Sequence, residues 1–192
     1  MLPPLLRQVA SYGYAVFDNG DYDLNIVGIR SKNNEANKFD DLMTCTYKEG
    51  DRWVSKYWPC TTDPGLYWLD NPSRIDGTAI LVPGQYRGTY VLDKHRGKYE
   101  ALCQRSGKVK VFRDSNKDNI LDMDPNSVVE GFFGINIHRA SSKRKSTQVE
   151  KWSAGCQVIA DPADFAELIV LARMQLEKRG WGKFTYTLIE EE

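Results

Sequence analysis

The middle of the chain alternates short apolar runs with turn residues. The runs "TAILVPG", "GTYVL", "KYEALCQ" and "KVKVF", which lie within residues 78–112, are rich in β-branched or aromatic residues. They are separated by "PGQYRG", "DKHRG" and "RSGK", which carry the Gly, Pro, Asp and Ser that turns require. In "KVKVF", strict alternation puts Val109 and Val111 on one face and the lysines on the other. This pattern predicts a half-buried β-sheet.

One helix is clear late in the chain. Asp161 can cap its N-terminus, Pro162 suits the first helical position, and Gly180 can close its C-terminus in the left-handed conformation. Apolar residues recur at helical spacing on one face: Phe165, Leu168, Ile169, Ala172 and Leu176. The segment "FTYTLI" (residues 184–189) then alternates as a strand, and "PPLLRQVASYG" near the start predicts a short helix. Residues 31–52 are too polar to assign.

These patterns predict a mainly β (α+β) fold. A chain of 192 residues, 41% of them hydrophobic, is long enough for one well-buried core. We find no internal repeat or linker. We therefore expect a single catalytic domain over residues 1–192, with residues 1–75 as an extension packed on a core of residues 76–189.

Charge and hydropathy limit the partners. Lys plus Arg and Asp plus Glu number 26 each, which gives no support for a nucleic-acid partner. The first residues lack the basic and apolar regions of a signal peptide, and no later segment reaches the roughly 18 apolar residues of a membrane span. We therefore expect no transmembrane segment and synthesis in the cytoplasm.

The four cysteines, at positions 45, 60, 103 and 156, are too far apart for a CxxC-type zinc site and too few for a disulfide framework. We expect reduced thiols when the protein is made, and an even count leaves a disulfide open after export.

Candidate chemistry lies in "GFFGINIHRASSKRKSTQVEKWSAGCQVIA", residues 131–160. "GINIH" predicts a strand whose polar face carries Asn136 and His138. Cys156 follows Ser153, Ala154 and Gly155, small residues that let a substrate approach and leave backbone N–H groups free for an oxyanion. A nearby imidazole would activate the thiol. The alternative is that "CQVIA" is a core strand and His138 a surface histidine, and the residues alone leave both open.

An apolar strand ending in His, then a Cys after 17 intervening residues that end in Ser-x-Gly, then another apolar strand: this pattern resembles the signature of the L,D-transpeptidase catalytic domain. The match is "FGINIHR" to "SAGCQVI", from Phe133 to Ile159. The resemblance implies a β-sandwich-like fold and cleavage, through a thioester, on the carboxyl side of the L-centre of the diamino acid in peptidoglycan stem peptides. It implies Cys156 as nucleophile, His138 as general base and later acid, and N–H groups near Gly155 as oxyanion donors. Ser153 matches the hydroxyl position, and the chemistry requires no cofactor.

The chain departs from that signature in two places. Ala154 stands where the family usually has His or a similar residue, and Gln157-Val158 stand where an Arg usually follows the Cys, so the usual carboxylate-binding group is missing. Basic residues of the intervening loop outnumber its one Glu five to one, and Arg139 is the one we favour for a substrate carboxylate. A solvated lysine-rich loop is the alternative. Trp152 is expected either to wall the groove or simply to pack.

A second motif is "DSNKDNILD", in which Asp114, Asn116, Asp118 and Asp122 match the first half of a calcium loop. Asn119 replaces the expected Gly, and Pro125 the bidentate Glu. A structural calcium site and a plain acidic turn, whose side chains bind their own backbone, both stay open. His95, in "DKHRGKY", is expected to be exposed, with a place in the substrate groove as the alternative.

Three functions follow. The first is a hydrolase of peptidoglycan stem peptides, of phage-lysin or effector type, that acts at the cell wall after release or delivery. The second is a cross-linking L,D-transpeptidase. The third is a non-catalytic wall-binding or virion module, for which the missing arginine is the best argument.

Overall fold

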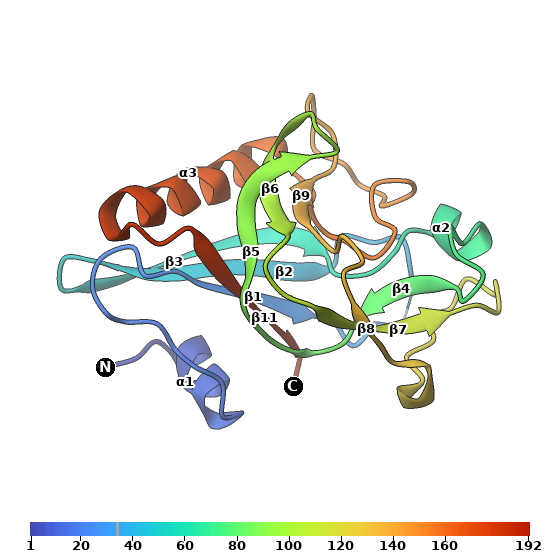
Figure 1. Cartoon of the computed structure of the whole chain (residues 1–192), viewed down its shortest axis with the longest axis horizontal. Helices are drawn as coiled ribbons and strands as arrows, with labels where there is room; N and C mark the ends of the chain where they lie inside the picture. Colours follow the sequence, from blue (N-terminus) through green and yellow to red (C-terminus); the bar gives the residue numbers. More distant parts are fainter. Residues whose placement is uncertain (34) are drawn as a thin grey trace.

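The computed structural model describes residues 1–33 and 35–192, and it shows an eight-stranded barrel with a small sheet at one end (Figure 1). The barrel order is β1-β11-β5-β6-β9-β10-β3-β2, which closes back on β1. Its strands are β1 (Asn25–Arg30), β2 (Asp41–Glu49), β3 (Arg52–Thr61), β5 (Gly84–His95), β6 (Tyr99–Gln104), β9 (Ile137–Arg139), β10 (Gln157–Ile159) and β11 (Lys183–Glu190). The predicted mainly β, α+β fold is confirmed, and its sheet takes the form of a closed barrel.

The small sheet has the order β4-β7-β8, with β4 (Thr78–Leu81), β7 (Val109–Asp114) and β8 (Val129–Gly131). The alternation in "KVKVF" is confirmed, because Val109 and Val111 are fully buried while Lys110 is exposed. This sheet has its own apolar cluster, built from Leu69, Ile80, Phe112 and Leu121. The helices are α1 (Pro4–Ser11), α2 (Leu66–Asp70), α3 (Pro162–Arg179) and the 3-10 helix η1 (Pro125–Ser127).

Helix α3 packs along the barrel beside β6, β9 and β10 (Figure 1). Its predicted ends are confirmed: Asp161 accepts a hydrogen bond from the Ala163 N–H at 2.9 Å, and Gly180 is left-handed with φ of 63°. One residue of the predicted buried face is wrong, since Leu176 is 45% exposed. Gln175 is buried in the last turn instead, because its side chain binds backbone groups of Leu24, Trp181 and Lys183.

The first 75 residues contribute β1, β2 and β3 to the barrel. Strand β1 pairs in parallel with β11, so the two ends of the chain meet in one sheet. The segment of residues 31–52, which the sequence left unassigned, holds all of β2, and position 34 within it lies outside the described residues. The "PPLLRQVASYG" helix is confirmed as α1.

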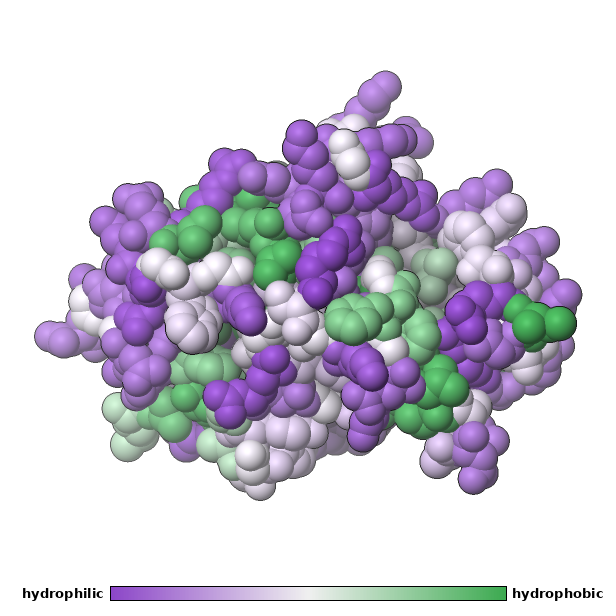
Figure 2. Space-filling view, in the orientation of Figure 1, coloured by the Kyte–Doolittle hydropathy of each residue, from purple (hydrophilic) through white to green (hydrophobic). Residues whose placement is uncertain are grey.

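Hydrophilic and hydrophobic side chains both lie on the face of the molecule that Figure 2 shows. Figure 2 shows mostly hydrophilic residues, with hydrophobic residues in separate patches among them. In the described part of the chain, no helix has the length and apolar character to cross a bilayer.

Candidate active site

The loop before Cys156 is fixed by a buried serine. The Ser153 Oγ accepts a hydrogen bond from the Gly155 N–H at 3.1 Å and donates to the Cys156 carbonyl at 2.8 Å. Gly155 has φ of 112°, and a Cβ there would lie 2.3 Å from the Ala79 carbonyl oxygen. Only glycine fits this backbone. Gly155 therefore serves the close approach of the loop to β4, and substrate access through the small residues stays a prediction.

Cys156 is partly buried, whereas the other three cysteines are fully buried, and all four are free thiols. Its Sγ donates to the Gly134 carbonyl at 3.4 Å. Burial raises the pKa of Cys156 to about 11, although the Asn136 backbone N–H and the charge of Arg96 act in the opposite direction. The resting thiol is therefore neutral at pH 7.

The oxyanion donors differ from the expectation in one respect. The Gly155 N–H is already taken by Ser153 Oγ, because the loop turns back on that side chain. The Cys156 N–H has no acceptor within residues 1–33 and 35–192. One backbone donor, rather than two, is thus free beside the thiol.

Parallel pairing of β9 and β10 brings His138 and Cys156 to neighbouring strands. Ile137 pairs with Gln157, and His138 pairs with Val158. Cys156 comes just before Gln157, so along the strands it lies two residues from the position opposite His138. A rise of about 3.3 Å per residue and a strand spacing of about 4.8 Å put their Cα atoms on a diagonal of about 8 Å. No hydrogen bond joins the thiol to an imidazole in the described chain.

His138 is buried, and its ring orientation is set by its own strand. Its Nδ1 lies 2.8 Å from the Arg139 carbonyl oxygen, so Nδ1 carries the hydrogen and Nε2 keeps its lone pair. Burial and the neighbouring His95 lower the pKa of His138 to about 3. The imidazole is therefore neutral at pH 7, with the tautomer that a base acting through Nε2 needs.

His95 is the second histidine of the site, and the prediction that it is exposed is wrong. It is buried as the last residue of β5, and its ring stacks on that of His138 in β9 with centroids 4.1 Å apart. The Asn136 amide fixes its tautomer. Asn136 Oδ1 accepts from the Gln104 N–H at 2.8 Å, so its Nδ2 donates to His95 Nδ1 at 3.1 Å. His95 therefore carries its hydrogen on Nε2, and burial lowers its pKa to about 4.

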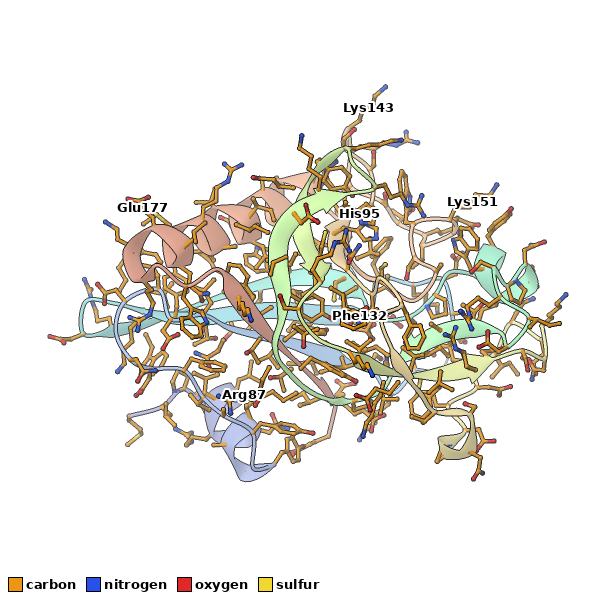
Figure 3. All side chains as sticks on the ribbon, in the orientation of Figure 1. Arg87, His95, Phe132, Lys143, Lys151 and Glu177 are labelled. Carbon is orange, nitrogen blue, oxygen red and sulfur yellow. The ribbon has the colours of Figure 1, made fainter. Side chains whose placement is uncertain are left out.

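Two cavities meet at this histidine. The first, the histidine pocket, has a volume of about 370 Å³ and is lined by His95, Arg96, Lys98, Tyr99, His138, Arg139, Ala140, Ser142, Lys151 and Trp152. The second, the thiol pocket, has a volume of about 500 Å³ and is lined by Ser73, Arg74, Ala79, His95, Arg96, Arg105, Arg113, Phe132, Phe133, Gly134, Ile135, Asn136, Ala154 and Cys156. His95 and Arg96 line both, and Figure 3 shows His95 above Phe132 at the end of the barrel near the small sheet.

The residues predicted to bind substrate lie on the histidine side. The Arg139 guanidinium stacks 3.9 Å from the Tyr99 ring centroid, and Trp152 is 44% exposed at the edge of the same pocket. Lys143 is exposed at the tip of its loop (Figure 3). Arg139 and Trp152 therefore line the pocket of the base, and the thiol has other neighbours.

The "DSNKDNILD" segment forms a turn held by its own side chains. Asp118 Oδ1 accepts from the Ile120 N–H at 2.9 Å, and Asp114 Oδ2 from the Asp122 N–H at 3.1 Å. The Asn116 amide donates to the carboxylates of Asp118 and Asp122. Among the described residues, no three His, Cys, Asp or Glu side chains are grouped to hold a metal ion. These are the hydrogen bonds of an acidic turn, and calcium binding stays a prediction.

Sequence reasoning missed Arg113, Asn136 as an orienting group, and the stacking of His95. Arg113 had a signal, since alternation in "KVKVFR" puts it on the same buried face as Val109 and Val111. A charge on an apolar face calls for a partner or a ligand. The His95 stack had no such signal, because it depends on how β5, β6 and β9 are arranged in the barrel.

Comparison of the chain with protein-family models, with curated proteins and with solved structures finds no match.

Proposed function

We propose that the protein is a cysteine-dependent hydrolase that cleaves peptidoglycan stem peptides through a thioester on Cys156. The observation that carries this proposal is the neighbouring placement of two groups. Strand β9 holds His138 with its Nε2 lone pair free, and the adjacent β10 is preceded by a partly exposed thiol in an open pocket. The segment from "FGINIHR" through "SAGCQVI" resembles the L,D-transpeptidase signature, and this resemblance supplies the substrate class.

The residues present account for each step of the reaction. The Cys156 Sγ attacks the peptide carbonyl while its proton passes to His138 Nε2, and the Cys156 N–H donates to the oxyanion. His138 then gives that proton to the leaving amine, so the C–N bond breaks and the thioester remains. Water, deprotonated by the same nitrogen, hydrolyses the thioester and restores the thiol. An amine in place of water would form a cross-link.

This mechanism requires one rearrangement. In the resting structure the thiol hydrogen points to the Gly134 carbonyl, and the proton transfer needs Sγ to exchange that acceptor for His138 Nε2. Both groups are neutral before the reaction, since burial raises the thiol pKa and lowers the imidazole pKa. The pair thus works by general base catalysis as the substrate binds, and not from a preformed ion pair.

The test is mass spectrometry of purified peptidoglycan, and of soluble muropeptides from it, after incubation with the wild type, Cys156→Ala and Cys103→Ala. Cys103 is a buried thiol outside both pockets, so its variant is the matched control. We expect shortened stems with the wild type and Cys103→Ala and none with Cys156→Ala. New dimers in place of shortened stems would indicate a transpeptidase. Parallel reactions with calcium and with a chelator test the calcium prediction.

One observation favours a second candidate, a non-catalytic wall-binding module. The Cys156 thiol has a raised pKa, and in the described chain its hydrogen bond goes to a carbonyl instead of an imidazole. Such a module would sediment with peptidoglycan and leave its muropeptides unchanged, in the wild type and Cys156→Ala alike.

A further inference from the structure

Four arginines converge on the thiol pocket from separate parts of the chain. Arg74 precedes β4, Arg96 lies in the β5–β6 turn, Arg105 follows β6, and Arg113 belongs to β7. No acidic side chain of the described residues lines this pocket. Because the whole chain has no net charge, the positive charge at this cavity is a local concentration, and the cavity contains the candidate nucleophile.

The carboxylates around the pocket neutralise only part of this charge. Asp76 forms a bidentate ion pair with Arg74, whose Nε and Nη2 donate to its two carboxylate oxygens at 2.8 and 3.0 Å. Asp93 Oδ2 lies 2.9 Å from Arg105 Nε. Arg96 has no ion pair within the described chain. Two carboxylates thus face four guanidinium groups, and the pocket keeps a surplus of positive charge that attracts an anion.

The unneutralised positive charge is clearest at Arg113, whose guanidinium has donors without an acceptor in the described chain. Its side chain is 7% exposed and packs against the Phe133 ring at 4.6 Å, while its Nη1 donates to the Gly77 carbonyl at 3.2 Å. Its Nε lies 3.6 Å from Asp76 Oδ2, too far for a hydrogen bond. Nε and Nη2 are buried without a hydrogen-bond partner in the described chain. A buried donor without an acceptor is costly, so this guanidinium is prepared for a ligand oxygen.

We propose that the thiol pocket is a carboxylate-binding site for the acyl-donor peptide, with Arg113 as its inner anchor and Arg96 at its mouth. The planar fork of a guanidinium matches the two oxygens of a carboxylate. Phe132, Phe133 and Ile135 line the same cavity and suit the apolar parts of a peptide. A carboxylate held there keeps a neighbouring peptide carbonyl close to Sγ. The site therefore selects peptides with a free carboxylate near the scissile bond.

This inference rests on the proposed function and replaces Arg139 as the expected carboxylate ligand. Arg139 lies over Tyr99 in the histidine pocket and does not line the thiol pocket. The group that the L,D-transpeptidase signature has just after its Cys is supplied here from β7 and from the β5–β6 turn.

Binding can be measured without turnover, by calorimetric titration of full-length Cys156→Ala. The probes are N-acetyl-L-lysyl-D-alanine and the same dipeptide with a C-terminal amide, which differ mainly in charge. Arg113→Gln and Arg96→Gln are added to the Cys156→Ala background. Arg96 is exposed, so its variant tests the site even where Arg113→Gln does not fold. Arg87→Gln is the matched control, since Arg87 is exposed and lines neither the thiol pocket nor the histidine pocket; Figure 3 shows it apart from His95 and Phe132.

We expect the acid to bind at least about tenfold more tightly than the amide, the ratio that one charge-assisted hydrogen bond produces. Arg96→Gln and a folded Arg113→Gln each remove most of this preference, and Arg87→Gln keeps it. Equal binding of acid and amide, no binding of either, or a preference that survives at Arg96→Gln overturns the proposal. Inorganic phosphate that displaces the acid with equal affinity overturns the assignment to carboxylates.

Binding and turnover together distinguish a failure of the carboxylate site from a failure of the proposed hydrolase. Selective binding of the acid by Cys156→Ala, together with intact peptidoglycan after incubation with the wild type, rejects the hydrolase and keeps the site. Turnover of acid and amide substrates at equal rates keeps the hydrolase and rejects the site.

Discussion

The imidazole rings of His95 and His138 stack with centroids 4.1 Å apart, and they carry their hydrogens on opposite nitrogens. The Arg139 carbonyl holds the hydrogen of His138 on Nδ1, whereas the Asn136 amide leaves the hydrogen of His95 on Nε2. Two stacked imidazolium ions would repel each other in a buried site, so both rings stay neutral. The stack thus preserves the lone pair on Nε2 of His138 as the base of the site.

Nuclear magnetic resonance can follow this neutral pair directly, because the chain has only two histidines. Burial lowers the pKa of His95 to about 4 and that of His138 to about 3. We expect the ring-carbon shifts of both to stay at neutral values from pH 8 down to about pH 5, well below the ordinary pKa of about 6.5. A midpoint near 6.5 for either ring would contradict the stacked, buried arrangement.

The same shifts predict how stability depends on pH. Unfolded histidine, with a pKa of about 6.5, binds protons more tightly than either folded ring, so the contribution of the pair falls as pH drops from about 6.5. Asp41 acts in the opposite sense, because burial and the neighbouring Asp63 raise its folded pKa to about 6. A comparison of variants isolates the histidine contribution, because Asp41 contributes equally to both proteins. We expect the free energy of unfolding of His95→Gln, whose side chain cannot take a proton, to fall less between pH 7 and pH 5 than that of the wild type. Urea titrations measure both, and equal losses would exclude the linkage to His95.

Alkylation of Cys156 reports its protonation state. With its pKa raised to about 11, the thiolate fraction at Sγ grows throughout the neutral range. We expect the rate of modification by iodoacetamide to rise about tenfold per pH unit between pH 7 and 10, because only the thiolate reacts. Peptide mass spectrometry identifies the modified residue, and buried Cys45 is the internal control. A rate that is already constant at pH 7 would indicate a preformed thiolate–imidazolium pair.

Much of the fold was predictable because local patterns dictate it. Alternation placed Val109 and Val111 in the core, and Asp161 and Gly180 marked both ends of α3. Leu176 shows the limit of such patterns. Helical spacing alone does not reveal that this end of the helix packs through Gln175, whose amide satisfies three backbone groups, one at Leu24 and two around the start of β11.

The candidate site was predictable in its residues and less so in its geometry. The sequence indicated His138, Cys156 and the small residues from Ser153 to Gly155, but not the hydrogen bonds of Ser153 that fix their loop. The long-range pairings stayed hidden, because the parallel register of β9 and β10 and the position of His95 at the end of β5 beside β9 depend on the closed barrel. The convergence of four arginines was hidden for the same reason, since they come from four separate segments.

Replacement of His138 distinguishes its role as a base from its role in packing. His138→Gln removes the Nε2 lone pair, and we expect kcat on peptidoglycan fragments to fall by about 10²- to 10⁴-fold, the usual contribution of a general base. Tyr99→Phe is the matched variant, because the Tyr99 hydroxyl lies 3.4 Å from Nδ1 while the 2.8 Å bond to the Arg139 carbonyl remains. We expect it to keep kcat within a few-fold. Equal losses in both variants would assign the effect to packing around the ring and not to proton transfer.

Gly155 is the position where the backbone before the thiol tolerates no side chain. In Gly155→Ala, the added Cβ would meet the Ala79 carbonyl oxygen at 2.3 Å, and φ of 112° is a conformation that alanine rarely adopts. Gly50→Ala is the matched control, since Gly50 also has positive φ, of 60°, and its Cβ would meet open space. We expect Gly50→Ala to lower the free energy of unfolding by about 1–2 kcal/mol, the ordinary cost of a left-handed residue. Gly155→Ala adds the strain of moving the loop off β4, about 1–3 kcal/mol more, and misplaces Sγ. Urea unfolding of the two variants measures the difference, and equal losses would show that the loop can move away from Ala79 without strain.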